Sequence, residues 1–239
     1  MTVPALLLVA HGSRDARHAA TMDAIADRLR GVLPDLRVGV GYLDHDGPDV
    51  ADAAMALGGP VRAVPMLLSH AFHHKVDLPG ALAKARARGA VIEAADPLGP
   101  DPALLVAAAH RLRAAGAQPG PGTGLVLAYA GTRDSAAATA VLALARRWQR
   151  RTGAEVRVAH AAATGPGLAA MVAQLRAGGA HRVDVAPWFL APGRLLDATR
   201  AAAHLAGADT VAAPLGDAPA VIEAVLHRFD AGGRARPAA

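Results

Sequence analysis

The sequence predicts an α/β fold of two similar doubly wound domains, each with a four-stranded parallel sheet. A length of 239 residues with 53% hydrophobic content is enough for two cores of ordinary size. Short apolar runs alternate with longer amphipathic segments, as in parallel sheets covered by crossover helices. The unit also occurs twice, since PLGPDPALLVAAAHRL from Pro97 recurs 117 residues later as PLGDAPAVIEAVLHRF from Pro214.

The first half should contain four strands and four helices in alternation. Its apolar runs predict strands over residues 5–10, 37–43, 62–69 and 90–95. The amphipathic segments between and after them predict helices over 16–33, 49–57, 78–89 and 102–116. Short continuous apolar runs are typical of buried parallel strands, whereas the longer segments show helical spacing of apolar residues.

The second half repeats this order of elements. LVLAYA, EVRVAHA, RVDVAPWFLA and DTVAAP predict its four strands. Three further landmarks recur at offsets of 119, 118 and 122 residues: VAHGSRD returns as AYAGTRD, Pro48 as Pro166, and VPMLLSHAFHH as APWFLAPGRLL. We therefore expect domains over 1–115 and 124–231, a Pro- and Gly-rich linker over 116–123, and a frayed tail over 232–239.

Composition excludes several classes of protein. The sequence has no cysteine, which excludes disulfides and thiolate metal sites, and no apolar run of membrane-spanning length. The opening MTVPALLLVA lacks the basic start and cleavage site of a signal peptide, so we expect a cytoplasmic protein without membrane contact. The net charge of +5 is carried by scattered arginines, with 3% aromatic residues, which favours a small polyanionic substrate over nucleic acid.

Three metal-competent side chains follow three predicted strands of the first half: His11, Asp44 and His73. Ligands of open parallel sheets bind beyond the carboxyl ends of the strands, where the strand order reverses. With the order 2-1-3-4, the first and third strands are neighbours, and these side chains converge. Imidazole and carboxylate bind borderline divalent metals and also accept protons. The second half has Ala130, Ala162 and Leu195 at the matching positions, so we expect one site.

Each of these residues also has a structural interpretation. A lone histidine such as His11 is more often an ordinary loop residue, and HGSR could form a helix N-cap through Ser13 or Asp15 with a small-anion site at the helix end. Asp44 and Asp46 are also common in turns. Similarly, the histidines at 70, 73 and 74 could form a polar loop. We assign to surface or packing His18, His110, His160, His181, His204 and His227.

Three motifs together carry a resemblance to a known family: LLLVAHGSRD, GYLDHDGP and VPMLLSHAFHHKVDLP. With them the chain resembles the ATP-independent tetrapyrrole chelatases of the sirohydrochlorin type, the cobaltochelatase and ferrochelatase family of cobalamin and siroheme synthesis. The resemblance spans essentially the whole chain, including the long form with two fused, related domains. It implies a monomer that inserts Co²⁺ or Fe²⁺, with Ni²⁺ as a third candidate, into sirohydrochlorin or a close precursor.

The resemblance also implies roles for particular residues. His11 and His73 match the metal-binding and catalytic histidines of the family, and Asp44 stands where relatives often have Glu. Ala71 replaces the glycine of the Gly-x-His turn. The residues expected to bind the polycarboxylate macrocycle are Ser13, Arg14, Ser69, His70, Phe72, His74 and Lys75. No GxxxxGK[ST] motif occurs, in agreement with a reaction that uses no nucleotide.

The expected mechanism places the metal on His11 and His73, with one of them or Asp44 removing pyrrole protons and the macrocycle gripped between the halves. Two alternatives remain open. One is a non-catalytic metal carrier. The other is a phosphoryl-transfer enzyme with His11 as nucleophile and Arg14 as phosphate clamp, although the order His-Gly-Ser-Arg reverses the Arg-His-Gly of histidine phosphatases. The sequence leaves the metal and the oxidation level of the macrocycle undecided.

Overall fold

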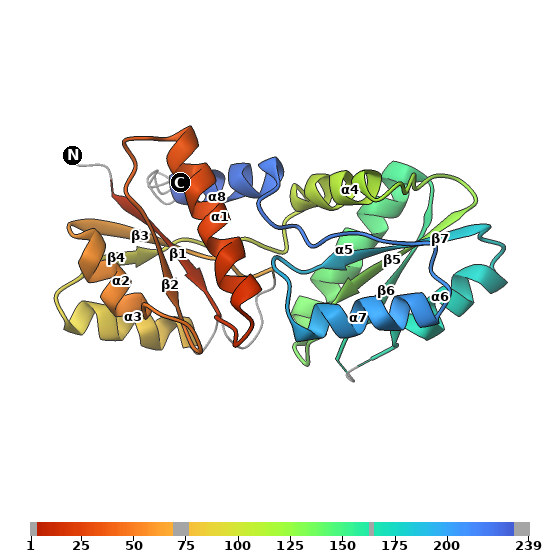
Figure 1. The fold of residues 1–239 in the computed structure, drawn as a ribbon, viewed down its shortest axis with the longest axis horizontal. Helices are drawn as coiled ribbons and strands as arrows, with labels where there is room; N and C mark the ends of the chain where they lie inside the picture. The colour runs from red at the N-terminus through yellow and green to blue at the C-terminus, as the bar shows by residue number, and fades with distance from the viewer. Residues whose placement is uncertain (1–3, 69–76, 163–164, 232–239) are drawn as a thin grey trace, which may run out of the picture. The chain divides into compact units, whose positions relative to one another are not determined.

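A computed structural model describes residues 4–68, 77–162 and 165–231 of the chain. It forms two compact units, one made of Met1–Gly99 with Asp217–Ala239 and the other of Pro100–Gly216 (Figure 1). Among the helices within these described ranges, none has the length and apolar character needed to cross a lipid bilayer.

The first unit is built on four parallel strands: β1 (Ala5–Ala10), β2 (Val38–Tyr42), β3 (Pro60–Pro65) and β4 (Val91–Ala94). Their order is β2-β1-β3-β4, which confirms the predicted order 2-1-3-4. All six residues of β1 are buried, because this strand is central in the sheet and covered on both faces. β3 ends at Pro65, four residues before the predicted end at residue 69.

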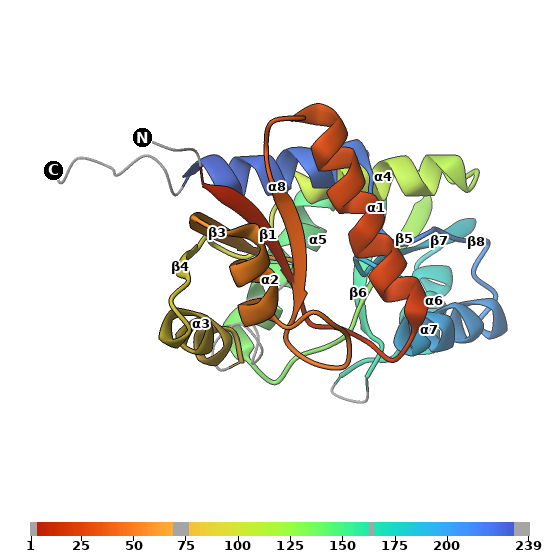
Figure 2. The ribbon, with the colours of Figure 1, turned by 60° about the vertical axis from the view of Figure 1, so that its left-hand side comes forward.

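Helices cover both faces of this sheet (Figure 2). On one face, α2 (Val50–Leu57) and α3 (Leu78–Ala87) pack on Leu7 and Val9 of β1. The other face carries α1 (Ala16–Val32) and the last helix of the chain, α8 (Pro219–Ala231). Alternate residues of a strand point to opposite faces, so the continuous apolar run of β1 supplies both layers of the core.

The second unit repeats the architecture with β5 (Thr123–Tyr129), β6 (Glu155–His160), β7 (Arg182–Trp188) and β8 (Thr210–Val211) in the order β6-β5-β7-β8. Its helices are α4 (Leu104–Ala114), α5 (Ser135–Thr152), α6 (Leu168–Ala177) and α7 (Arg194–Leu205). Two four-stranded parallel sheets of this kind are the fold class that the repeat predicted.

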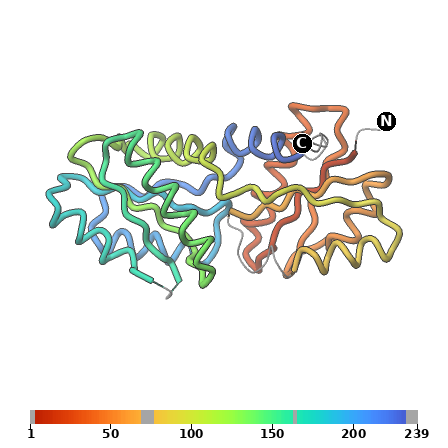
Figure 3. The backbone as a smooth tube through the Cα atoms, turned by 180° about the vertical axis from the view of Figure 1, so that it is seen from behind, coloured from red at the N-terminus to blue at the C-terminus, as the bar shows by residue number. Residues whose placement is uncertain are grey.

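The compact units differ from the expected domains 1–115 and 124–231, because the last helix of each repeat belongs to the other unit (Figure 3). Helix α4 follows β4 but packs on β7, whereas α8 follows β8 and packs on β3. The segment 116–123, expected as the linker between the repeats, lies within the second compact unit. It connects α4 to β5 inside the second unit, and its Ala117 is fully buried there.

The exchanged helices bury equivalent faces. Leu104, Leu105 and Leu112 of α4 are buried, and Val221, Ile222 and Phe229 lie 117 residues further on in α8 and are buried too. An arginine of each helix also bonds to the unit that receives it: Arg111 donates to the Leu215 carbonyl and Arg228 to the Pro97 carbonyl. The chain thus passes between the units near Gly99 and again near Gly216.

Candidate active site

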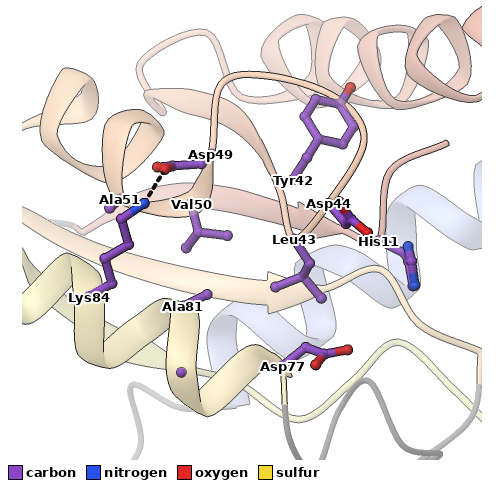
Figure 4. Close-up of a pocket in the computed structure, with 11 residues that line it drawn as sticks. His11, Tyr42, Leu43, Asp44, Asp49, Val50, Ala51, Asp77, Ala81 and Lys84 are labelled. Atoms are coloured by element: carbon purple, nitrogen blue, oxygen red, sulfur yellow. Dashed lines mark hydrogen bonds and ion pairs between the residues drawn. The ribbon is translucent and has the colours of Figure 1, made fainter. Parts of the chain in front are cut away.

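A pocket of about 610 Å³ opens in the first unit beyond the carboxyl ends of β1 and β2 (Figure 4). This is the edge of the sheet at which the strand order predicts a ligand site. Its polar lining consists of His11, Tyr42, Asp44, Asp49, Asp77 and Lys84. The pocket therefore contains two of the three residues that the sequence placed at strand ends.

Gly12 lets the loops that follow β1 and β2 approach each other closely. The Asp44 backbone N–H donates to the His11 carbonyl at 2.9 Å. Gly12 has a φ of +92°, and a Cβ added there would lie 1.7 Å from the Asp44 carbonyl oxygen. Only glycine combines this backbone conformation with such a contact. The HG pair of the first motif thus places His11 beside Asp44, and the His11 Nδ1 lies 3.3 Å from the Gly12 carbonyl oxygen.

The loop after β2 contributes the carboxylates of Asp44 and Asp46 and the imidazole of His45, and only His45 was missed by the sequence analysis. His45 has a positive φ of 65°, and its Nε2 lies 3.4 Å from the Asp44 Oδ2. Its ring centroid is 6.2 Å from that of His11. The signal available in the sequence was the run Asp-His-Asp, where His45 stands between two residues already considered.

Asp46 joins this loop to the segment before α1. Its Oδ2 accepts a hydrogen bond from the Ser13 backbone N–H at 2.8 Å. Ser13 in turn accepts from the Asp15 N–H, and the Asp15 side chain caps α1 by accepting from the Arg17 N–H at 3.1 Å. The capping role proposed for HGSRD is confirmed for Asp15, and it coexists with the position of His11 at the pocket.

A partly buried His18 and a buried Tyr42 lie near each other behind these loops, with ring centroids 6.4 Å apart. Burial lowers the pKa of His18, against the opposing effect of Asp46, and nearby His11 lowers it further. The His18 Nδ1 is buried and makes no hydrogen bond within the described residues, with the Asp46 Oδ2 at 4.0 Å. Burial also raises the pKa of Tyr42 to about 12, with the charges of Asp23 and Asp46 adding to the effect. Tyr42 thus remains a neutral phenol at physiological pH.

An ion pair borders the pocket between α2 and α3, and the sequence analysis did not identify it. Lys84 Nζ lies 2.6 Å from Asp49 Oδ2 (Figure 4). Asp49 also caps α2 by accepting from the Asp52 backbone N–H at 2.8 Å. The Lys84 hydrogen bond, followed by that from Asp52, holds the pKa of Asp49 below its usual value. The pair keeps an ammonium group at the pocket wall.

The second unit has a pocket of about 380 Å³ at the equivalent place. Corresponding residues of the two pockets differ by 118 in number, as Val50 with Leu168 and Lys84 with Ala202. The Ala162 N–H donates to the Ala130 carbonyl, which repeats the bond between Asp44 and His11. The structure therefore confirms that His11 and Asp44 correspond to these two alanines. The backbone of the site is retained in the copy, whereas its metal-competent side chains are not.

The pairing of His73 with Leu195 is not supported by the neighbouring elements. Pro65 of β3 corresponds to Pro187 of β7, an offset of 122, because they pair with equivalent residues of β1 and β5. The following helices correspond at an offset of 118, since the Ala90 N–H bonds to the Ala85 carbonyl as the Ala208 N–H does to that of Ala203. The connection is four residues longer in the first half, so the expected pairing falls where the repeats differ in length.

Several predicted site residues lie outside the described residues: Ser69, His70, Phe72, His73, His74 and Lys75. Arg14 is described and exposed, although it is not among the residues lining the pocket. Within the described part of the chain, no three or more His, Asp or Glu side chains come together as a metal site. Of the three residues predicted to bind metal or catalyse the reaction, the described part of the chain places two at the pocket, His11 and Asp44.

Fold and pocket define a two-unit α/β protein with a polar site at the carboxyl edge of its first sheet. A model of the CbiX family matches residues 5–115 and 124–231. These matches cover most of both repeats, so the chain belongs to the CbiX family, and the resemblance found in the motifs is confirmed. No match was found among curated proteins.

Solved structures share the fold over nearly the whole chain. SirB from Bacillus subtilis with Fe³⁺ has a TM-score of 0.80 and 24% identity, covering 96% of this chain and 95% of that chain. The sirohydrochlorin chelatase SirB from Bacillus subtilis subspecies spizizenii in complex with cobalt has a TM-score of 0.79 and 22% identity, with coverage of 96% and 94%. CbiX, the terminal enzyme for siroheme biosynthesis in denitrifying bacteria, has a TM-score of 0.68 and 23% identity, with coverage of 95% and 98%.

Proposed function

We propose that this protein is an ATP-independent metal chelatase that inserts cobalt or iron, as the divalent ion, into sirohydrochlorin or a related tetrapyrrole. The observation that carries the proposal is the polar pocket of the first unit, where His11 and Asp44 meet, together with its copy that has alanine at both positions. Membership of the CbiX family supports it, as do the SirB structures with Fe³⁺ and with cobalt.

His11 is proposed as a ligand of the incoming metal, together with His73. A neutral imidazole nitrogen suits a borderline divalent ion, because it is a good donor that costs little to deprotonate near neutral pH. The bond between the Asp44 N–H and the His11 carbonyl fixes the backbone of His11, which places its side chain at the pocket before the metal arrives. A preorganised ligand loses less conformational freedom on binding.

Asp44 is proposed to accept protons from the macrocycle. Two pyrrole N–H protons must leave as the metal enters, and a carboxylate within reach of them can act as the base. The Asp44 side chain is 63% exposed, so it can pass each proton on to water. His45, whose Nε2 lies 3.4 Å from Asp44 Oδ2, is a second group able to take up a proton there.

The macrocycle carries carboxylates on a large ring, and we propose that residues of the first and third sequence motifs bind it. The proposed set is Ser13, Arg14, Ser69, His70, Phe72, His74 and Lys75. Guanidinium and ammonium groups bind carboxylates through charge-assisted hydrogen bonds. Insertion of cobalt would serve cobalamin synthesis, and insertion of iron would serve siroheme synthesis.

The test is an insertion assay with sirohydrochlorin and Co²⁺, Fe²⁺ or Ni²⁺, followed by the absorption of the macrocycle. We expect His11→Ala to abolish most insertion, and Asp44→Ala to reduce it less. His160→Ala is the matched control, because His160 lines the equivalent pocket of the second unit. A wild-type protein that binds metal without changing the absorption of the macrocycle would be a carrier. Full activity of His11→Ala/His73→Ala would exclude this site.

A further inference from the structure

We propose that Lys84 binds a carboxylate side chain of the tetrapyrrole and thereby orients the macrocycle in the pocket. The inference rests on the proposed function and assigns a substrate contact to a residue that neither the motifs nor the repeat indicated. Lys84 lies on α3, lines the pocket, and is held there by Asp49.

Asp49 fixes the ammonium group and leaves it able to bind a further oxygen. Its Oδ1 is occupied by the Asp52 N–H at the start of α2, while its Oδ2 accepts from Lys84 Nζ. The Asp49 carboxylate is therefore fixed to the start of α2, and it keeps the Lys84 ammonium group at the pocket wall. An ammonium group has three N–H donors, and the Lys84 side chain is 61% exposed. Donors remain for a substrate carboxylate without loss of the pair.

The charge of the pocket explains why a cation is needed there. Asp44, Asp49 and Asp77 all line it, so a carboxylate of the macrocycle would be repelled by any of them that has no cation beside it. Lys84 is the only lysine or arginine among the described residues that line the pocket. His11 cannot supply the positive charge, because it must be neutral to bind metal. Among the described residues, Lys84 is therefore the one beside which a carboxylate entering this pocket is stabilised best.

The position of Lys84 also fits the shape of a macrocycle. Figure 4 shows Lys84 and Asp49 at one end of the pocket and His11 with Asp44 at the other. The metal enters the centre of a tetrapyrrole, whereas its carboxylates lie on the periphery. A cation displaced along the pocket from His11 suits that separation.

The chain offers a matched control for this proposal. Arg88 and Asp52 form a second ion pair between the same two helices, at 2.7 Å and with similar exposure. Neither residue lines the pocket. If the Lys84 pair only ties α3 to α2, then Lys84→Met and Arg88→Met should have the same effect on macrocycle binding.

The experiment titrates metal-free sirohydrochlorin into each full-length variant. For Lys84→Met we expect the Kd to rise about fivefold, the effect of losing one partly exposed charge contact, and to depend less on NaCl concentration. Arg88→Met should leave the Kd unchanged, and Lys84→Arg should restore most of the affinity. In insertion assays, the KM for the macrocycle should rise while that for the metal stays constant.

A double variant separates attraction by Lys84 from its neutralisation of Asp49. Asparagine also caps helices, so Asp49→Asn/Lys84→Met removes both charges and keeps the start of α2. Its Kd should remain above that of the wild type. A wild-type Kd in this double variant, or equal effects of Lys84→Met and Arg88→Met, would overturn the inference. A wild-type protein that binds sirohydrochlorin but inserts no metal would refute only the proposed function, and the comparison of Kd values would still decide the role of Lys84.

Discussion

Gly12 controls the contact between the two loops of the site, so Gly12→Ala tests the whole arrangement. The added Cβ would lie 1.7 Å from the Asp44 carbonyl oxygen, and the shortest ordinary contact is 3.4 Å. The loops must therefore move apart by about 1.7 Å. An alanine at positive φ costs roughly 1–2 kcal/mol. Loss of the bond between the Asp44 N–H and the His11 carbonyl adds about 1 kcal/mol.

Gly89→Ala is the matched control for this substitution. Gly89 ends the α3 segment with a φ of +94°, close to that of Gly12, and nothing lies within 4 Å of its added Cβ. It should lose only the conformational part, roughly 1–2 kcal/mol. Gly12→Ala should lose roughly 2–3 kcal/mol. It should also slow metal insertion by about 100-fold, because a misplacement of about 1 Å at a reacting group can cost that much.

Urea unfolding followed by circular dichroism, together with the insertion assay, measures both effects. If Gly12→Ala is no less stable than Gly89→Ala and inserts metal at the wild-type rate, the described contact between the loops is wrong. If both variants lose activity equally, the loss reflects a general change in the first unit and not the geometry of His11 and Asp44.

Two further predictions concern the stability of the first unit. The pKa of Asp49 is lower in the folded protein than its usual value of 3.8, so its stabilisation is present above that pH and is lost as the pH falls through the folded pKa. Asp49→Asn should therefore flatten the acid limb of the stability–pH profile, and an unchanged profile in urea titrations would contradict this. Phe229→Ala should cost about 3 kcal/mol in the first unit, because its helix covers that sheet. Both tryptophans, Trp148 and Trp188, lie in the second unit, so circular dichroism should report an earlier transition while tryptophan fluorescence is unchanged.

Much of the site follows from the sequence because neighbouring parallel strands end at one edge of a sheet. The apolar runs located β1 and β2, and the order 2-1-3-4 placed their ends side by side. His11 and Asp44 follow those ends and are joined by a backbone hydrogen bond. The alanines of the second half could be matched to them because the offset changes by only one residue between the two strands.

The Lys84 pair could not be predicted in the same way. Asp49 and Lys84 are 35 residues apart, on two helices whose relative rotation depends on how α2 and α3 pack. An exposed lysine and an N-capping aspartate each have an ordinary local interpretation, and neither indicates the other. The position of His45 near His11 likewise depends on its positive φ, which the residue type alone does not indicate.

The sequence by itself determined the repeat, the two parallel sheets, and which half keeps the metal-competent side chains. These properties depend on local periodicity and on strand order. Only the tertiary structure decided that α4 covers the second sheet and α8 the first. The two helices bury the same pattern of apolar residues, so either helix could cover either sheet. Apolar burial is non-directional, and the connections beyond Gly99 and Gly216 select the partner.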